Sequence, residues 1–365
     1  MTTPLDPGFT GTTRSGLVRN QSLDATRSVA LLGIIILNYH GYLNRANAIG
    51  SQYSNFFMRI MDAWNGILAP SPVIFVMVSG ISCALLTSAN FDRWVLVRRG
   101  VFLFAIGSMF EWVWNGTILP YYGLYFVLAS VVVTWSRRHL ALLTGACATF
   151  AAALSMWRFF REQDLHSTSW LSPRFPYTPR NFVFRYFVDY THPIFPWFAF
   201  FCIGLIIGKS LPWFFANRLR LLAPLGAGVA VVYGISTIVR RSTDGAWQRV
   251  TSTDPFERGV LATVGVAMTS ILVIITVSLI VERRPDSPIV VALSRAGQVT
   301  LTLYIMHGLA YNAIVNRLHW VTATGLDAAL GLSVLMWLFL VTFGSWWQRF
   351  IGRGPIERVY RKFGG

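Results

Sequence analysis

Two histidines stand inside apolar runs of this sequence. His40 lies near the end of "RSVALLGIIILNYHG" (27–41), and His307 lies in "GQVTLTLYIMHGLAYN" (297–312). An ionisable residue inside a membrane span costs roughly 2.5–3.5 kcal/mol on insertion scales, so it is a functional candidate by default. Because histidine titrates near neutral pH, either residue could be the general base that activates a hydroxyl group, or could carry an acyl group.

Each histidine also has an explanation without chemistry. His40, at the outer edge of its run, would simply be hydrated at the level of the lipid headgroups. His307 would join two helices by a hydrogen bond. The second explanation is weaker, because His307 sits deeper in its run and beside Tyr304.

Further polar groups flank the apolar runs in "MDAWNG" (61–66), "EWVWNG" (111–116) and "DYTH" (189–192). A carboxylate beside a histidine orients the ring and raises its basicity, so Asp62 and Glu111 are candidate partners in catalysis. The residues expected to contact substrate are Asn38, Trp64, Asn65, Asn115, His192 and Tyr304. Ordinary polarity at the membrane interface is the alternative for each of them.

Arginines mark the opposite ends of the apolar runs. Arg27, Arg98, Arg99 and Arg295 all sit at such edges. Their forked hydrogen bonds suit phosphate groups, as in a coenzyme A donor. The charge bias of membrane topology explains most of them without a ligand. Arg27 is the strongest candidate, because it begins an apolar helix with Asp24 one turn earlier as its partner.

Several other chemistries are absent from the sequence. It has no phosphate-cradling glycine loop with Lys and Ser/Thr, no dinucleotide fingerprint, no H-E-x-x-H pair and no G-x-S-x-G elbow. Cys83, Cys147 and Cys202 lie in apolar runs and are interpreted as small core residues. We therefore expect no metal site, and the presence of only two lysines argues against a catalytic lysine.

The elements that position these residues are predicted to be membrane helices. Of the 365 residues, 54% are hydrophobic and 13% charged, with 14 Trp and 27 Phe. Soluble proteins average roughly 25% charged residues, so this chain is interpreted as an integral membrane protein. The net charge of +16 comes mainly from arginines that flank apolar runs. That placement indicates topology and lipid headgroups, not nucleic acid.

Ten apolar segments predict an all-α polytopic membrane helix bundle with about ten transmembrane helices. They cover approximately 28–43, 67–88, 100–114, 118–135, 139–157, 193–211, 219–239, 259–281, 297–316 and 325–346. With the N-terminus in the cytoplasm, 19 Lys and Arg fall on the cytoplasmic side and 12 outside. The positive-inside rule favours this orientation, and the even number of helices puts both termini in the cytoplasm.

The chain is expected to form a single transmembrane bundle over 28–346. A polar cytoplasmic tail (1–27) precedes it, with no cleaved signal peptide, and a basic cytoplasmic tail (347–365) follows it. The outer loop 158–192 is rich in aromatics and arginine, so it is predicted to lie on the interface or to cap a cavity. Both histidines then lie near the outer face and the arginine cluster near the cytoplasm.

Four stretches, in order, resemble the YeiB-type bacterial membrane proteins. "LDATRSVALLGIIILN" is similar to "LD-x-x-RG-x-A-x-LGI-x-x-x-N", with Ser28 in place of glycine. "NGTILPYYGLYFVLA" resembles "DGDIL-x-x-YGL", with Asn115 where aspartate is usual. "GQVTLTLYIMHGL" resembles "GRMALTNYLLQ", and "GRGPIERVYRKFG" resembles "GPxEWLWR". The resemblance covers nearly the whole chain.

That resemblance implies kinship with membrane acyltransferases, namely acyltransferase family three and the heparan glucosaminide acetyltransferases. The first group has an arginine, ten residues and a histidine on its first helix. Counted from Arg27, this spacing ends at Asn38, two residues before His40. The "YxxH" of related enzymes is similar to Tyr304-Ile-Met-His307. "DAWNGILAPSPVIFVMVSGIS" resembles a segment of the glucosaminide group, with Asp62 near the place of its catalytic histidine.

We therefore expect an O-acyltransferase in the bacterial inner (plasma) membrane. It would move an acyl group, with acetyl-CoA as donor, from the cytoplasm to a hydroxyl of a cell-envelope glycolipid or sugar. A trehalose mycolate is one conceivable acceptor. The alternatives are a transporter or flippase, which intramembrane polar groups also fit, and a scaffold without a ligand. The resemblance and the lack of a detectable inverted repeat favour the enzyme.

Overall fold

The computed structural model describes residues 9–12, 18–47, 70–86, 92–239, 241, 245–254, 257–321 and 326–364. Within them the fold is all-α, as predicted, apart from one antiparallel pair of short strands, β1 (Phe9–Thr12) and β2 (Val18–Asn20). The chain divides into two compact units. Unit 1 comprises Met1–Phe75 and Val273–Val359, and unit 2 comprises Val76–Leu272 and Tyr360–Gly365.

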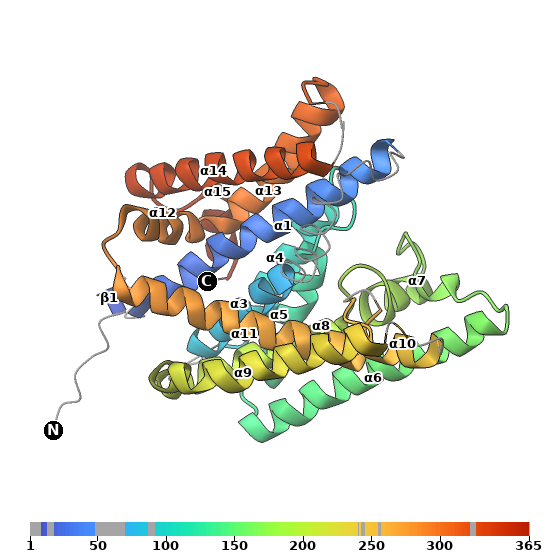
Figure 1. Cartoon of the computed structure of the whole chain (residues 1–365). Coiled ribbons are helices and arrows are strands. Elements are labelled where there is room, and N and C mark those ends of the chain that lie inside the picture. The colour runs from blue at the N-terminus through green and yellow to red at the C-terminus, as the bar shows by residue number, and fades with distance from the viewer. Residues whose placement is uncertain are drawn as a thin grey trace. The chain divides into compact units, whose positions relative to one another are not determined.

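Unit 1 is built around the first helix. Its helices are α1 (Gln21–Asn47), α12 (Pro288–Gly297), α13 (Thr300–Tyr311) with the π-helical turn η3 (Asn312–Arg317), α14 (Leu326–Phe350) and the start of α15 (Pro355–Gly364). Figure 1 shows α12 and α14 alongside α1, and these three helices pack on one another. The side chain of Asn20 starts α1 by accepting from the backbone N–H of Ser22 at 3.0 Å and of Leu23 at 3.2 Å.

A close backbone approach joins α12 to α1. A Cβ atom on Gly297 would lie 1.9 Å from the carbonyl oxygen of Asp24, so this position accepts only glycine. Directly after it, the chain turns by 84° between α12 and the run formed by α13 and η3. The predicted segment 297–316 therefore begins at a bend, with a separate amphipathic helix before it.

Unit 2 contains the central helices of the sequence. They are α4 (Trp94–Phe110), α5 (Leu119–Val132), α6 (Arg137–Gln163), α8 (Ile194–Lys209), α9 (Leu211–Val239) and α10 (Gly245–Thr251). The boundary between the units falls within α3 (Pro70–Leu86), α11 (Val260–Arg283) and α15. Small residues let α4 and α5 meet, because a Cβ on either Gly100 or Gly123 would lie 2.6 Å from the other glycine's carbonyl oxygen.

The predicted outer loop 158–192 is largely helical. Helix α6 runs on to Gln163, and three short elements follow it. They are η1 (Ser169–Leu171), α7 (Pro179–Val183) and the π-helical turn η2 (Phe184–Val188). Thr178 caps α7 by accepting from the backbone N–H of Asn181 at 3.1 Å.

All ten predicted apolar segments fall on helices, but fewer helices are long enough to cross a membrane. Among the described residues, four qualify by length and composition: α6, α9, α11 and Ala328–Phe350 of α14. The bent α12–α13 pair adds a fifth if it is one span. The apolar helices α3, α5 and α8 have 17, 14 and 16 residues, short of the roughly 20 that a straight span needs. The chain is a multi-pass membrane protein, and the total of ten spans stays a prediction.

Candidate active site

His307 lies at the centre of a buried group in unit 1. Its side chain has no exposed surface. Nδ1 of the ring is hydrogen-bonded to the carbonyl oxygen of Tyr304, one turn earlier on α13. Nε2 lies 3.1 Å from Nδ2 of Asn38 on α1. The hydroxyl of Tyr39 donates to the backbone carbonyl of His307 at 2.8 Å, so α1 holds both the ring and the main chain of this residue.

These contacts assign the proton on the imidazole. A carbonyl oxygen only accepts hydrogen bonds, so Nδ1 of His307 must carry the hydrogen. In the neutral ring Nε2 then holds the lone pair, which accepts from the amide of Asn38. Nε2 is therefore the atom from which His307 could take a proton.

Tyrosine rings enclose this group, which we call the His307 centre (Asn38, Tyr39, Tyr304, His307 and Tyr311). The ring of His307 lies 4.8 Å from that of Tyr304 and 6.2 Å from that of Tyr39, measured between centroids. Tyr39 and Tyr311 are 4.8 Å apart. Such a dry aromatic surround strengthens the electrostatic interactions of the histidine.

The second predicted histidine, His40, takes a different direction from Asn38. Residues two positions apart in an α-helix point in directions that differ by roughly 200°, because each residue adds a rotation of about 100° around the helix axis. Asn38 and Tyr39 make the hydrogen bonds from α1 to His307. His40 therefore lies outside the face of α1 that contacts His307, and it is partly exposed. The arginine spacing within α1 also ends at Asn38. Asp62, Trp64 and Asn65 lie outside the described residues.

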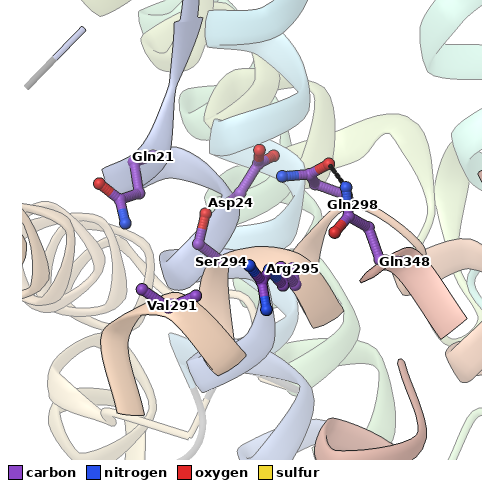
Figure 2. Close-up of a pocket in the computed structure, with 7 residues that line it drawn as sticks. All are labelled: Gln21, Asp24, Val291, Ser294, Arg295, Gln298 and Gln348. Carbon is purple, nitrogen blue, oxygen red and sulfur yellow. Dashed lines mark hydrogen bonds between the residues drawn. The ribbon is translucent and has the colours of Figure 1, made fainter. Parts of the chain in front are cut away.

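A polar pocket of about 300 Å³ opens at the other end of α1 (Figure 2). Its lining residues are Gln21, Asp24, Val291, Ser294, Arg295, Gln298 and Gln348, from α1, α12, α14 and the turn after α12. Asp24 is buried and pairs with Arg27 at 2.5 Å. Figure 2 shows Gln348 donating to Gln298, at 2.9 Å, within this pocket. Because Asp24 is paired with Arg27, the guanidinium of Arg295 in the lining suits an anion.

The four predicted donor arginines fall into two pairs. Arg295 lines the polar pocket and Arg27 holds Asp24 in its wall. In unit 2, Arg98 donates to the carbonyl of Gly364 at 3.3 Å, and the Arg99 guanidinium lies 5.2 Å from the Tyr360 ring centroid. These two arginines thus hold the end of α15, where a helix terminus attracts cations.

Unit 2 holds a cluster of buried and partly buried charges, the arginine–carboxylate cluster (Glu111, Arg158, Arg185, Asp189 and Arg258). Arg158 and Arg258 each bind one carboxylate oxygen of Asp189. Arg258 also donates to the carbonyl of Tyr190. Arg185 pairs with Glu111 and donates to the carbonyl of Arg174. Burial raises the pKa of Glu111, and the attraction of Arg185 opposes that rise.

His192 lies beside this cluster with a neutral ring. The hydroxyl of Tyr125 donates to its backbone carbonyl at 2.5 Å, and its ring lies 4.5 Å from that of Trp197. Burial, together with the nearby charge of Arg258, lowers the pKa of His192 to about 3. Among the described residues, two buried nitrogen atoms here have no hydrogen-bond partner, Arg185 Nε and His192 Nδ1, whereas the hydroxyls of Tyr121 and Thr191 interact with each other. Asn115 is exposed in the turn between α4 and α5.

Sequence reasoning missed Tyr39, the three pocket glutamines and Arg258. Their partners are remote in sequence, and Arg258 looked like one of many loop arginines. In the described part of the chain, no three His, Cys, Asp or Glu lie close enough to hold a metal ion.

Two family comparisons match the chain. The catalytic region of heparan-alpha-glucosaminide N-acetyltransferase matches residues 19–247, which is more than half of the chain and includes all of α1. A family described as a protein of unknown function, DUF418, matches residues 212–364, which include His307. No curated protein matches the chain.

Proposed function

The chain belongs to the family of the heparan-alpha-glucosaminide N-acetyltransferase catalytic region, and from this premise we propose that it transfers an acetyl group from acetyl-CoA to a hydroxyl group of a sugar or glycolipid. At the family level it is an acetyltransferase-like membrane enzyme. The donor, the hydroxyl acceptor and the passage from the cytoplasm to the outer face of a bacterial inner membrane are our proposals. The topology of ten spans with both termini in the cytoplasm is part of the same proposal.

The observation that carries the proposal is the lone pair on Nε2 of His307. Because the Tyr304 carbonyl fixes the hydrogen on Nδ1, the buried ring presents a base at Nε2. In the proposed step Nε2 removes the proton from the acceptor hydroxyl, whose oxygen attacks the thioester carbonyl. The carbon–sulfur bond then breaks, and His307 gives the proton to the departing sulfur, so coenzyme A leaves as its thiol and the histidine is neutral again.

Asn38 has a second part in this step. The incoming hydroxyl would take its place as the hydrogen-bond partner of Nε2. The displaced amide, which starts 3.1 Å from that nitrogen, would donate to the thioester oxygen as negative charge develops there. His40, Asp62 and Glu111 stay candidate catalytic residues, and Trp64, Asn65 and Tyr304 stay candidate substrate contacts.

The polar pocket is the proposed site for the charged head of the donor. Arg295, which lines the pocket, would supply a guanidinium group for its phosphates, and Arg27, which pairs with Asp24 of the wall, is the second candidate. Along α1, Arg27 and Asn38 are eleven residues apart, or about 16 Å at 1.5 Å per residue. A pantetheine arm is an extended chain that suits such a span. Arg98 and Arg99 stay candidate donor ligands, although both contact α15.

For the acceptor, a polyhydroxyl compound is our proposal, and His192 stays a candidate contact. Asn115 stays a further candidate contact. Glucosamine, trehalose and a trehalose mycolate are suitable test acceptors, because they separate transfer to an amine from transfer to a hydroxyl and a free sugar from a lipid.

The test is transfer of labelled acetyl from acetyl-CoA by the purified protein, with these acceptors and an envelope extract. His307→Ala is expected to abolish transfer, while the exposed His166→Ala stays at the wild-type rate. Loss in His40→Ala with an active His307→Ala would move the role to His40. No coenzyme A binding and no transfer to any acceptor would overturn the enzyme and leave the transporter, for which acceptor flux in proteoliposomes is the measurement.

A further inference from the structure

The C-terminal segment "GRGPIERVYRKFG" (352–364) has no part in the chemistry described above. It follows α14 through a sharp turn in which Gly352 has a φ of +90°, a value that favours glycine. The chain then enters α15 at Pro355. Within unit 1, the first turn of this helix contacts α13, the helix that carries His307.

Glu357 grips the start of α13 with both carboxylate oxygens. The backbone N–H of Thr302 donates to one oxygen at 3.0 Å, and the hydroxyl of Thr302 donates to the other at 2.5 Å. Thr302 is in the first turn of α13, where backbone N–H groups lack partners within the helix. A carboxylate there also interacts favourably with the helix dipole.

The approach depends on the absence of a side chain at Gly354. A Cβ atom at that position would lie 2.1 Å from the Glu357 carboxylate and 2.6 Å from the Thr302 hydroxyl. The backbone N–H of Ile356 adds a hydrogen bond to the same hydroxyl at 3.3 Å. Gly354, the backbone N–H of Ile356 and the Glu357 carboxylate in "GPIE" are thus the parts of one clamp on Thr302.

His307 lies five residues beyond Thr302 on the same helix, a rise of about 7.5 Å. Tyr39 and Asn38 hold the helix at the histidine, and Glu357 holds it at its start. Because α13 follows directly on the 84° bend, its preceding chain does not continue its axis. The clamp therefore restrains the position of α13 along its own axis and its rotation about that axis, and so the distance of His307 from α1.

We propose that Glu357 is a positioning residue that, through Thr302 and α13, places Nε2 of His307 beside Asn38. The effect on transfer rests on the function proposed above, whereas the effect on α13 does not. A displacement of reacting groups by about 1 Å can cost about a hundredfold in rate, so a modest shift of this helix matters.

The variants separate the clamp's contacts. Glu357→Ala removes both hydrogen bonds and the charge. Thr302→Val removes the hydroxyl but keeps the backbone bond. Glu357→Gln can keep both contacts, because its amide donates to the hydroxyl and its oxygen accepts from the backbone. Arg358→Ala is the matched control on the same helix turn, since Arg358 is exposed and donates to the carbonyl of Ile351.

The readouts are amide hydrogen exchange of peptides covering α13, the thermal midpoint in detergent, and kcat and KM for acetyl-CoA. We expect Glu357→Ala to speed exchange in α13 and to lower kcat by about tenfold with KM within twofold. Thr302→Val should be intermediate, Glu357→Gln near wild type, and Arg358→Ala unchanged.

Two results would overturn the proposal. One is unchanged exchange in α13 in Glu357→Ala. The other is a lower thermal midpoint with unchanged kcat, which would make Glu357 a stabilising residue only. If the wild-type protein transfers nothing, the exchange arm still reports on the clamp. Failure of the proposed function is therefore distinguishable from failure of the clamp.

Discussion

In unit 1, neutral groups hold His307, namely a backbone carbonyl, a carboxamide and a phenol. In unit 2, guanidinium groups hold the carboxylates of the buried Asp189 and the partly buried Glu111. Neutral hydrogen bonds of about 1 kcal/mol can be exchanged for those of a substrate. Loss of one partner of a buried ion pair strongly destabilises the folded protein, because the other charge stays buried without compensation. The first arrangement suits a reacting atom and the second suits a fixed scaffold.

Removing the carboxylate of Asp189 should have the largest effect on stability. Asp189→Ala leaves Arg158 and Arg258 without their shared partner, and breaking a buried pair costs about 3–5 kcal/mol. We expect a large fall in the thermal midpoint, measured by detergent-solubilised unfolding. The exposed Asp164→Ala is the control. A wild-type midpoint in Asp189→Ala would break the contrast, because the cluster would then not be a scaffold.

Changing the partner of Nε2 should affect transfer more than stability. Asn38→Asp places a carboxylate where the amide donates, so the ring of His307 would take up a second proton. The lone pair on Nε2 would then no longer be available to accept a proton from the acceptor. Asn38→Leu frees the lone pair but removes the donor. We expect kcat to fall by about a hundredfold in the first and about tenfold in the second. Equal activity of the two variants would contradict the proton assignment on His307.

Neutralising the pocket arginine should weaken donor binding. Arg295→Gln keeps a polar side chain but removes the guanidinium, and we expect the KM for acetyl-CoA to rise by about tenfold with kcat nearly unchanged. The exposed Arg284→Gln, just after α11, is the control. If dephospho-coenzyme A and acetyl-CoA lose affinity equally in Arg295→Gln, the guanidinium does not bind the 3′-phosphate.

The smallest effect is the pH dependence of stability from His192. Its folded-state pKa of about 3 lies below its unfolded value near 6.5, so the unfolded chain binds the proton first. Stability is therefore fully present above about pH 6.5 and is lost as the pH falls toward 3. From pH 7 to 6 the loss is roughly 0.5–1 kcal/mol. His192→Gln should flatten this part of the profile, and an unchanged slope would show that another group titrates there.

Much of the fold could be predicted because apolar runs bounded by arginines and turn residues identify helices directly. The bend after Gly297 could not, since "GQVT" contains no proline and the turn depends on the contact of Gly297 with α1. Likewise, Glu111 and Arg185 are 74 residues apart, and no local pattern joins them.

Within the candidate site, the place of His307 in an apolar run and the spacing from Arg27 to Asn38 were the signals that made these two residues candidates. Both signals lie within one helix. The contact between them spans 269 residues, so it needed the structure. The C-terminal motif showed the same limit, because its glycine has meaning only beside Thr302.

The meeting of Gly297 with the main chain at Asp24 has a consequence for how the pocket fills. Two backbones in direct contact cannot slide past each other. The wall of the polar pocket that they form beside Asp24 and Arg295 is therefore in place before any ligand binds. A ligand entering it gives up its own freedom but need not order this wall. The observed rate of ligand binding to the pocket should then rise in proportion to ligand concentration, because no slow opening of the pocket precedes binding.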